Sequence, residues 1–187
     1  YHPHFLFNAL NTVYFQIDES NKAPRRTLEM ISELLRYQLY GGNQKVSILQ
    51  EIDYLKTYIA LRKLRMSERL RLRVEFPPEL NELNIYPLLF LPLVENAFKY
   101  VGGDYQLDII MKWENNRISL FIRNSIPELS AEDEALRKSV DKRQRKGIGL
   151  VNLRRRLSLL YPNKHRLETR KEETEFVAEL MIEIEDI

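Results

Sequence analysis

Four polar residues in one short segment carry chemistry suited to a magnesium-bound phosphate. Glu95, Asn96, Lys99 and Tyr100 are spaced i, i+1, i+4 and i+5, so a helix gathers them on one side, away from its apolar residues. Carboxylate and amide oxygens are ligands that Mg²⁺ prefers, and an ammonium group pairs with phosphate. The same spacing suits a solvated helix face with a Glu95–Lys99 ion pair. The spacing alone allows both interpretations.

A second segment with phosphate-binding chemistry is Gly147-Ile148-Gly149-Leu150, at the start of a predicted helix. Glycines permit tight turns and let backbone N–H groups approach a phosphate, and the helix N-terminus adds a partial positive charge. A capped loop without a ligand gives the same pattern. This segment alone therefore does not decide between a phosphate site and a simple helix start.

Helices are expected to dominate the first third of the chain. Apolar residues at helical spacing predict helices over about 4–18, 25–40 and 47–66. Ser47, with Glu51 shortly after it, is predicted to cap the third helix. The apolar stripes of the first two helices exceed what one hairpin can bury. A second copy of the chain would bury them in a four-helix bundle.

From residue 67 onward the periodicity predicts both strands and helices. The expected elements are a strand at 70–76, a helix at 87–101, a hairpin over 107–122, a helix at 147–161 and a final hairpin over 165–184. The stretch Glu128–Lys146 has 11 charged residues among 19 and no aromatic residue, which predicts a mobile loop. The order predicts an α+β fold, with a helical region at 1–66 and a mixed sheet covered by helices on one face at 67–187.

Composition limits the classes of function. The 187 residues include no cysteine, which excludes disulfides and thiolate chemistry. The net charge of +2 does not call for nucleic acid or membrane. Basic residues within 137–146 and 154–156 suggest a nucleic-acid binder, but acids are interleaved in the first run and aromatic residues for stacking are missing nearby. No stretch predicts a membrane helix or a signal peptide, and the chain is expected to be a fragment of a longer protein.

Three motifs, in this order, resemble those of the LytS-like sensor histidine kinases. They are P-H-F-L-F-N at 3–8, P-L-V-E-N-A at 92–97, and G-I-G-L followed by Asn152 and Arg156-Leu157. The resemblance spans the chain from His2 to about Pro162. It implies an N-terminal helical hairpin that forms a dimeric four-helix bundle. A Bergerat-type α/β sandwich ATPase domain, of the kind shared with DNA gyrase, would follow.

The resemblance also implies a role for each matched residue. His4 would accept the γ-phosphoryl group of ATP, and Asn96 would bind Mg²⁺. The residues expected to bind ATP are Glu95, Asn96, Lys99, Tyr100, Asn124, Gly147, Ile148, Gly149, Leu150 and Asn152. Asn8, one turn after His4, would either orient a water against phospho-His4, a spacing that resembles the phosphatase element of other histidine kinases, or serve in helix packing or an inter-helix hydrogen bond. Phe5 stands where many other histidine kinases carry an acidic residue, so the general base is unassigned.

One departure from the family concerns the recognition of adenine. The family carries Asp-x-Gly on the strand before the loop that covers ATP, whereas this chain has Arg123-Asn124-Ser125. Arg123 cannot accept a hydrogen bond, but Asn124 can if it faces inward. Losing a charge-assisted bond costs about 1.5–3 kcal/mol. Asn124 then substitutes, ATP binds weakly, or the chain is an inactive pseudokinase scaffold of the same fold.

The predicted function is that of the cytoplasmic portion of a bacterial inner-membrane sensor histidine kinase. It would use Mg-ATP to phosphorylate His4 and pass the phosphoryl group to an aspartate of a response regulator, in this family often one with a LytTR-type DNA-binding domain. The expected partners are a second copy and that regulator, without direct contact to nucleic acid. Membrane attachment is expected in segments outside this chain. His165 lies outside all motifs and is expected to be structural.

Overall fold

The structure, a computed structural model, describes residues 3–40, 42, 44–78, 80, 83–128 and 148–184. The chain divides into two compact units. Unit 1 comprises Tyr1–Met66 and Asn84–Pro87, and unit 2 comprises Ser67–Leu83 and Leu88–Ile187. The chain therefore enters unit 2 at Ser67, leaves it for four residues, and returns at Leu88.

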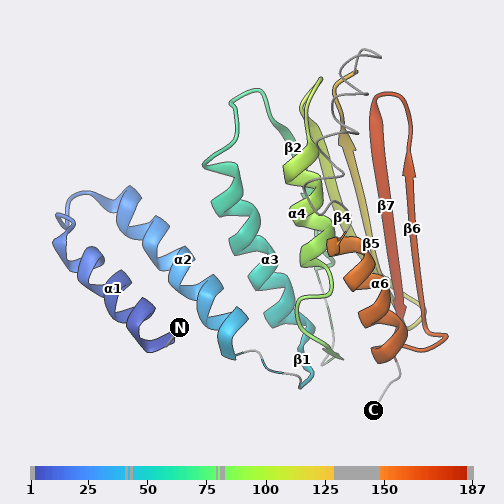
Figure 1. The fold of residues 1–187 in the computed structure, drawn as a ribbon, viewed down its shortest axis with the longest axis horizontal. Helices are drawn as coiled ribbons and strands as arrows, with labels where there is room; N and C mark the ends of the chain where they lie inside the picture. The colour runs from blue at the N-terminus through green and yellow to red at the C-terminus, as the bar shows by residue number, and fades with distance from the viewer. Residues whose placement is uncertain are drawn as a thin grey trace. The chain divides into compact units, whose positions relative to one another are not determined.

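Unit 1 is mainly helical. Its elements are α1 (Pro3–Gln16), α2 (Lys22–Tyr40), β1 (Val46–Ser47), α3 (Ile48–Lys63) and β3 (Asn84–Ile85). Helix α2 contacts both α1 and α3 and lies between them (Figure 1). Strands β1 and β3 pair antiparallel, with Val46 opposite Ile85 and Ser47 opposite Asn84. The three helices agree with the predicted ones to within a few residues at each end.

The cap of α3 differs from its predicted form. The Ser47 hydroxyl accepts a hydrogen bond from the Gln50 N–H at 3.2 Å, and the Gln50 side chain accepts one from the Ser47 N–H at 3.1 Å. The prediction that Ser47 opens this helix is confirmed, and the second member of the reciprocal capping box is Gln50, not the neighbouring Glu51. Glu51 is instead fully buried and accepts a hydrogen bond from the Tyr37 hydroxyl of α2 at 2.7 Å. Glu51 therefore joins α3 to α2 and does not cap the start of α3.

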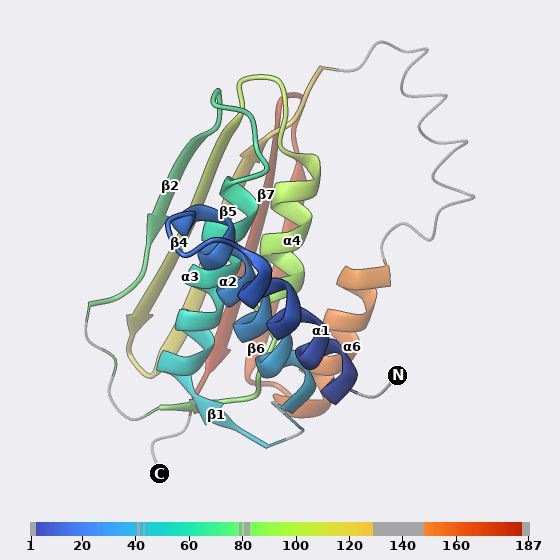
Figure 2. The ribbon, with the colours of Figure 1, turned by 90° about the vertical axis from the view of Figure 1, so that its left-hand side faces the viewer.

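Unit 2 contains a mixed sheet with helices on one face. The described strands are ordered β2 (Arg71–Glu75), β4 (Gln106–Glu114), β5 (Arg117–Ser125), β7 (Glu175–Glu183) and β6 (His165–Lys171). The β2–β4 pair is parallel and the other pairs are antiparallel. Helices α4 (Leu91–Tyr100) and α6 (Ile148–Leu160) lie on the same face of this sheet (Figures 1 and 2). The predicted α+β class with a mixed sheet is confirmed.

Alternation along the strands builds the core of unit 2. The buried residues of the inner sheet face include Leu107, Ile109, Met111, Ile118, Leu120, Ile122, Leu180 and Ile182. Those of the helices include Leu93, Val94, Ala97, Phe98, Leu153 and Leu157. Asn115 and Asn116 both have positive φ, of 51° and 58°, as a tight two-residue hairpin turn requires.

One predicted helix begins later than expected, and one predicted loop lies almost wholly outside the described residues. The helix expected from residue 87 begins at Leu91, so Pro92 lies in its first turn, where a missing N–H costs no hydrogen bond. The loop predicted over Glu128–Lys146 lies outside the described residues except for Glu128, and Gly147 lies outside them as well. Within the part of the chain that the structure describes, no helix is both long and apolar enough to cross a membrane.

Candidate functional site

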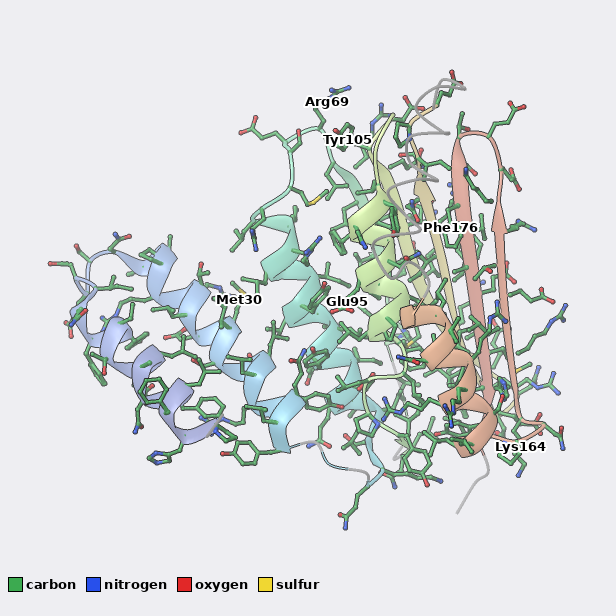
Figure 3. The ribbon with its side chains drawn as sticks, viewed as in Figure 1. Met30, Arg69, Glu95, Tyr105, Lys164 and Phe176 are labelled. Atoms are coloured by element: carbon green, nitrogen blue, oxygen red, sulfur yellow. The ribbon has the colours of Figure 1, made fainter. Side chains whose placement is uncertain are left out.

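Helix α4 presents its four predicted site residues away from the core. Glu95, labelled in Figure 3, and Lys99 are exposed, whereas Asn96 and Tyr100 are half-buried. The Lys99 ammonium lies 5.1 Å from the centre of the Tyr100 ring, a cation–π distance. The buried residues between them hold α4 against the sheet, since α4 contacts β5 and β4. The helix therefore offers an amide oxygen, a carboxylate and an ammonium along one exposed side.

Asn124 faces inward from β5. It follows Leu120 and Ile122 on the inner sheet face, and only 1% of its surface is exposed. Its Nδ2 donates to the Ser125 carbonyl at 3.3 Å, whereas its Oδ1 receives no hydrogen bond from the described residues. A buried polar atom without a partner costs about 1–3 kcal/mol, so such atoms are rare. Asn124 thus holds an acceptor at a place where a ligand donor would satisfy it.

Arg123 points to the opposite face of the sheet. Its Nε and Nη2 donate to Oδ2 of Asp108 at 3.0 and 2.7 Å. Asp108 is 5% exposed, and its hydrogen bond and negative charge raise the pKa of the Arg123 guanidinium. The arginine that departs from the expected Asp-x-Gly pattern therefore belongs to an outer ion pair and does not enter the inner face.

Ser125 ties the end of β5 to the loop after α4. Its hydroxyl donates to the Gly102 carbonyl at 2.6 Å and accepts from the Gln106 N–H at 2.9 Å. The Gly102 N–H in turn donates to the Ser125 carbonyl at 3.0 Å. A Cβ added to Gly102 would lie 2.9 Å from Cδ of Pro127, so the loop has no room for a side chain there. From the sequence, Ser125 is notable only because it replaces the glycine of the family pattern. The two hydrogen bonds of its hydroxyl could not be predicted, since both partners lie about twenty residues earlier in the chain.

Gly149, near the start of α6, is exposed. A Cβ built on it would meet no atom of the described residues within 4 Å. Leu150 is half-buried and Asn152 is exposed, while the placement of Gly147 and of the Ile148 side chain is not described. Because α6 contacts α4, the two predicted phosphate-binding segments lie on neighbouring helices of unit 2. The space at Gly149 leaves its backbone accessible.

His4 and Asn8 lie in unit 1, on α1. Both side chains are exposed, and Nδ2 of Asn8 lies 3.2 Å from Nδ1 of His4. His165, expected to be structural, has Nδ1 2.7 Å from the Tyr161 carbonyl, so this ring nitrogen donates to the carbonyl. The predicted site residues are thus divided: His4 and Asn8 in unit 1, the others in unit 2.

A magnesium site made only of protein side chains is not found. The described residues contain no group of three or more His, Asp or Glu that could hold a metal ion. The chemistry of α4 still fits Mg²⁺ bound together with a nucleotide, because this ion usually takes one or two protein oxygens and completes its shell with phosphate oxygens and water.

Comparison with known proteins finds similarity to histidine kinases. Residues 1–70 match the family model described as histidine kinase. The chain is 28% identical over 172 residues to the sensor protein kinase HptS of Staphylococcus aureus (strain USA300), covering 89% of this chain and 33% of that protein. It therefore spans about a third of the length of the curated relatives it matches.

Two solved structures support the fold. The histidine kinase domain of the blue-light activated histidine kinase from Erythrobacter litoralis EL346 matches with a TM-score of 0.51 at 14% identity, over 94% of this chain and 93% of that one. Full-length ShkA in complex with AMPPNP matches with a TM-score of 0.50 at 14% identity, over 97% of this chain and 44% of that one. At this identity, the likeness concerns the fold alone.

Proposed function

We propose, from the similarity of this chain to sensor histidine kinases, that unit 2 binds Mg-ATP and that His4 receives its γ-phosphoryl group. The observation that carries the proposal is the buried Oδ1 of Asn124, which no described residue satisfies. Asn124 lies on the strand that α4 contacts, and α4 carries the oxygen and ammonium groups suited to Mg²⁺ and phosphate. A buried acceptor and a phosphate-binding helix together suit a nucleotide.

The proposed partner of Asn124 is the exocyclic amino group of adenine. This group donates hydrogen bonds, and Oδ1 of Asn124 is an acceptor. Phe176, half-buried and labelled in Figure 3, stands opposite Asn124 in β7 and adds an apolar neighbour for the base. A neutral amide forms a weaker bond than a carboxylate, by about 1 kcal/mol, so affinity is expected to be several-fold lower than with Asp. A 6-oxo purine would place acceptor against acceptor.

Asn96 is proposed to hold Mg²⁺, and Lys99 to contact phosphate. When bound, the ion neutralises charge on the phosphates of the transferring group. Glu95 and Tyr100 complete this side of α4, while the backbone of Gly149 and its neighbours Gly147, Ile148, Leu150 and Asn152 would cradle the phosphates at the start of α6. The absence of a Cβ at Gly149 fits a close backbone approach.

The proposed reaction is an in-line displacement by the His4 imidazole. With the Asn8 amide turned so that its oxygen accepts from the Nδ1–H of His4, Nε2 keeps its lone pair, and Nε2 is the proposed nucleophile. The Nε2–P bond forms, the bond from γ-phosphorus to the bridging oxygen breaks, ADP leaves with that electron pair, and the ring loses one proton to water. A response-regulator aspartate, in a protein proposed to be of LytTR type, would then accept the phosphoryl group.

A second copy of the chain is the proposed partner of α1 and α2. No residue of α1 is buried, and Phe5 and Phe15 are 72% and 78% exposed. Leu39 and Tyr40 of α2 are also exposed. A four-helix bundle from two copies would cover part of this apolar surface. Signal detection and membrane attachment at the bacterial inner membrane are proposed for the part of the protein outside this chain, which would make this chain its cytoplasmic portion.

Calorimetric titration with ATP and with ITP, both with Mg²⁺, tests the proposed function. ATP is expected to bind, ITP to bind at least about tenfold more weakly, and Asn124→Ala to abolish the difference. Ser119→Ala, on the half-exposed outer side of the same strand, is the matched control and should behave like the wild type. A folded protein that binds neither nucleotide would instead support the scaffold alternative.

A further inference from the structure

We propose that the backbone turn at Leu88 is a positioning element of the nucleotide site, held in place by Arg156. The inference rests on the proposed function, because its readout is nucleotide binding. Leu88 is the residue at which the chain returns to unit 2, and three residues later α4 begins. Since α4 carries Glu95, Asn96 and Lys99, the conformation at Leu88 sets where these groups lie.

The turn has an unusual backbone. Leu88 has a φ of 59°, in the left-handed region that residues with a Cβ rarely adopt and that glycine adopts freely. A leucine is kept in such a conformation only where its surroundings over-determine it, and such positions gather near functional sites. The two following residues, Leu89 and Phe90, are fully buried, so the turn is fixed on the side of α4.

The helix that follows has no side-chain cap among the described residues, because Phe90, at its N-cap position, makes no side-chain capping hydrogen bond. The Phe90 carbonyl accepts hydrogen bonds there from the N–H groups of Leu93 and Val94, at 3.1 and 3.3 Å. A helix without a side-chain cap depends on the preceding segment for its direction. The Leu88 turn supplies that segment.

A contact within unit 2 holds the turn. Arg156 of α6 donates through Nη1 to the Leu88 carbonyl at 3.5 Å, a long contact of a half-buried guanidinium. Because α6 also contacts α4, this bond joins the turn before α4 to the neighbouring helix.

A graded substitution series separates this positioning role from simple side-chain packing. Replacing Leu88 by Gly, Ala and Val adds side-chain volume in that order but makes a left-handed backbone progressively less favourable. The proposal predicts that affinity for Mg-AMPPNP falls in the order Gly, Ala, Val, with Gly within about threefold of the wild type and Val about tenfold weaker. A packing role predicts the reverse order.

The measurement is calorimetric titration of the full chain with Mg-AMPPNP, with thermal unfolding of each variant in parallel. If Leu88→Val does not fold, Gly against Ala, which differ only in the Cβ, still decides. Arg156→Ala is expected to weaken binding about threefold or more, Arg156→Lys to restore part of it, and Arg155→Ala, exposed on the same helix, to have no effect. Equal affinities across the Leu88 series, or a rise from Gly to Val, would overturn the proposal. A wild type that does not bind nucleotide would refute the proposed function instead.

Discussion

The side-chain amide of Asn8 lies 3.2 Å from Nδ1 of His4, one helical turn further along α1. Both side chains are exposed. Within the described residues, this hydrogen bond to Asn8 is the polar contact of the His4 imidazole. An exposed ring that is held at one nitrogen has its rotation limited and its other nitrogen directed outward. Asn8 therefore limits the orientation of the His4 ring in the proposed reaction.

Removing this contact should slow the reaction without weakening nucleotide binding. Asn8→Ala is expected to lower the rate at which His4 is labelled by γ-labelled ATP about tenfold, because the ring is no longer oriented. Asn11→Ala changes the same kind of residue less than one turn further along α1 and should leave the rate unchanged. If Asn8→Ala labels at the wild-type rate, the orienting role is wrong and helix packing is the better account of Asn8.

The two glycines near the proposed site should respond to alanine in opposite ways. Gly149→Ala meets no neighbouring atom and should keep or raise stability by up to about 1 kcal/mol. Its affinity for ATP should nonetheless fall about tenfold, since the added methyl group blocks phosphate. Gly102→Ala places a Cβ against Pro127 and should destabilise the fold. Titration and urea unfolding check both, and unchanged affinity in Gly149→Ala would exclude a phosphate cradle there.

Ser125 is expected to be a stabilising residue of unit 2. Ser125→Ala leaves the Gly102 carbonyl and the Gln106 N–H without its hydroxyl and should lower the free energy of unfolding by about 1–3 kcal/mol. Ser125→Gly, which restores the glycine of the family pattern, should destabilise at least as much. Urea unfolding measures these differences, with Ser119→Ala as the control. A stability gain in Ser125→Gly would show that the hydroxyl contributes nothing.

The Tyr37–Glu51 contact predicts a pH dependence of the helical unit. Burial, with the nearby Glu51 carboxylate, raises the pKa of Tyr37 above its ordinary value of 10.0. The stabilising contribution is therefore fully present below pH 10 and declines above it, because the unfolded chain releases a phenol proton that the folded chain retains. Tyr37→Phe should lose less stability than the wild type as pH rises above 10, followed by urea unfolding. Parallel curves for the two proteins would contradict this.

The periodicity of the sequence is enough to predict most elements of unit 2. It does not predict which buried polar atoms find a hydrogen-bond partner. Alternation of Leu107, Ile109 and Met111 predicts a strand because one face of the sheet is buried and the period of a strand is two. The same alternation, extended along β5, turns Asn124 inward. Whether its oxygen finds a partner depends on segments distant in sequence, so the unsatisfied acceptor could be seen only in the structure.

The sequence does not decide which of two neighbouring residues takes a given structural role. Gln50 and Glu51 both suit the first turn of a helix, and Tyr37, fourteen residues from Glu51, decides which of them caps it. Pro87 predicts a helix start, because proline is common in the first turn, but Leu88 adopts a left-handed backbone and α4 begins only at Leu91. Tertiary contacts override local preference in both cases.

The central claim is tested most directly by labelling the full-length protein with γ-labelled ATP and Mg²⁺. The label should be acid-labile and base-stable, as a phosphohistidine is. It should be lost in His4→Gln and in Asn96→Asp. It should be kept in His165→Gln, because the His165 ring donates to the backbone carbonyl of Tyr161 and lies outside the proposed site. Label that persists in His4→Gln, or a folded protein that binds ATP and acquires no label, would contradict the proposed phosphorylation of His4.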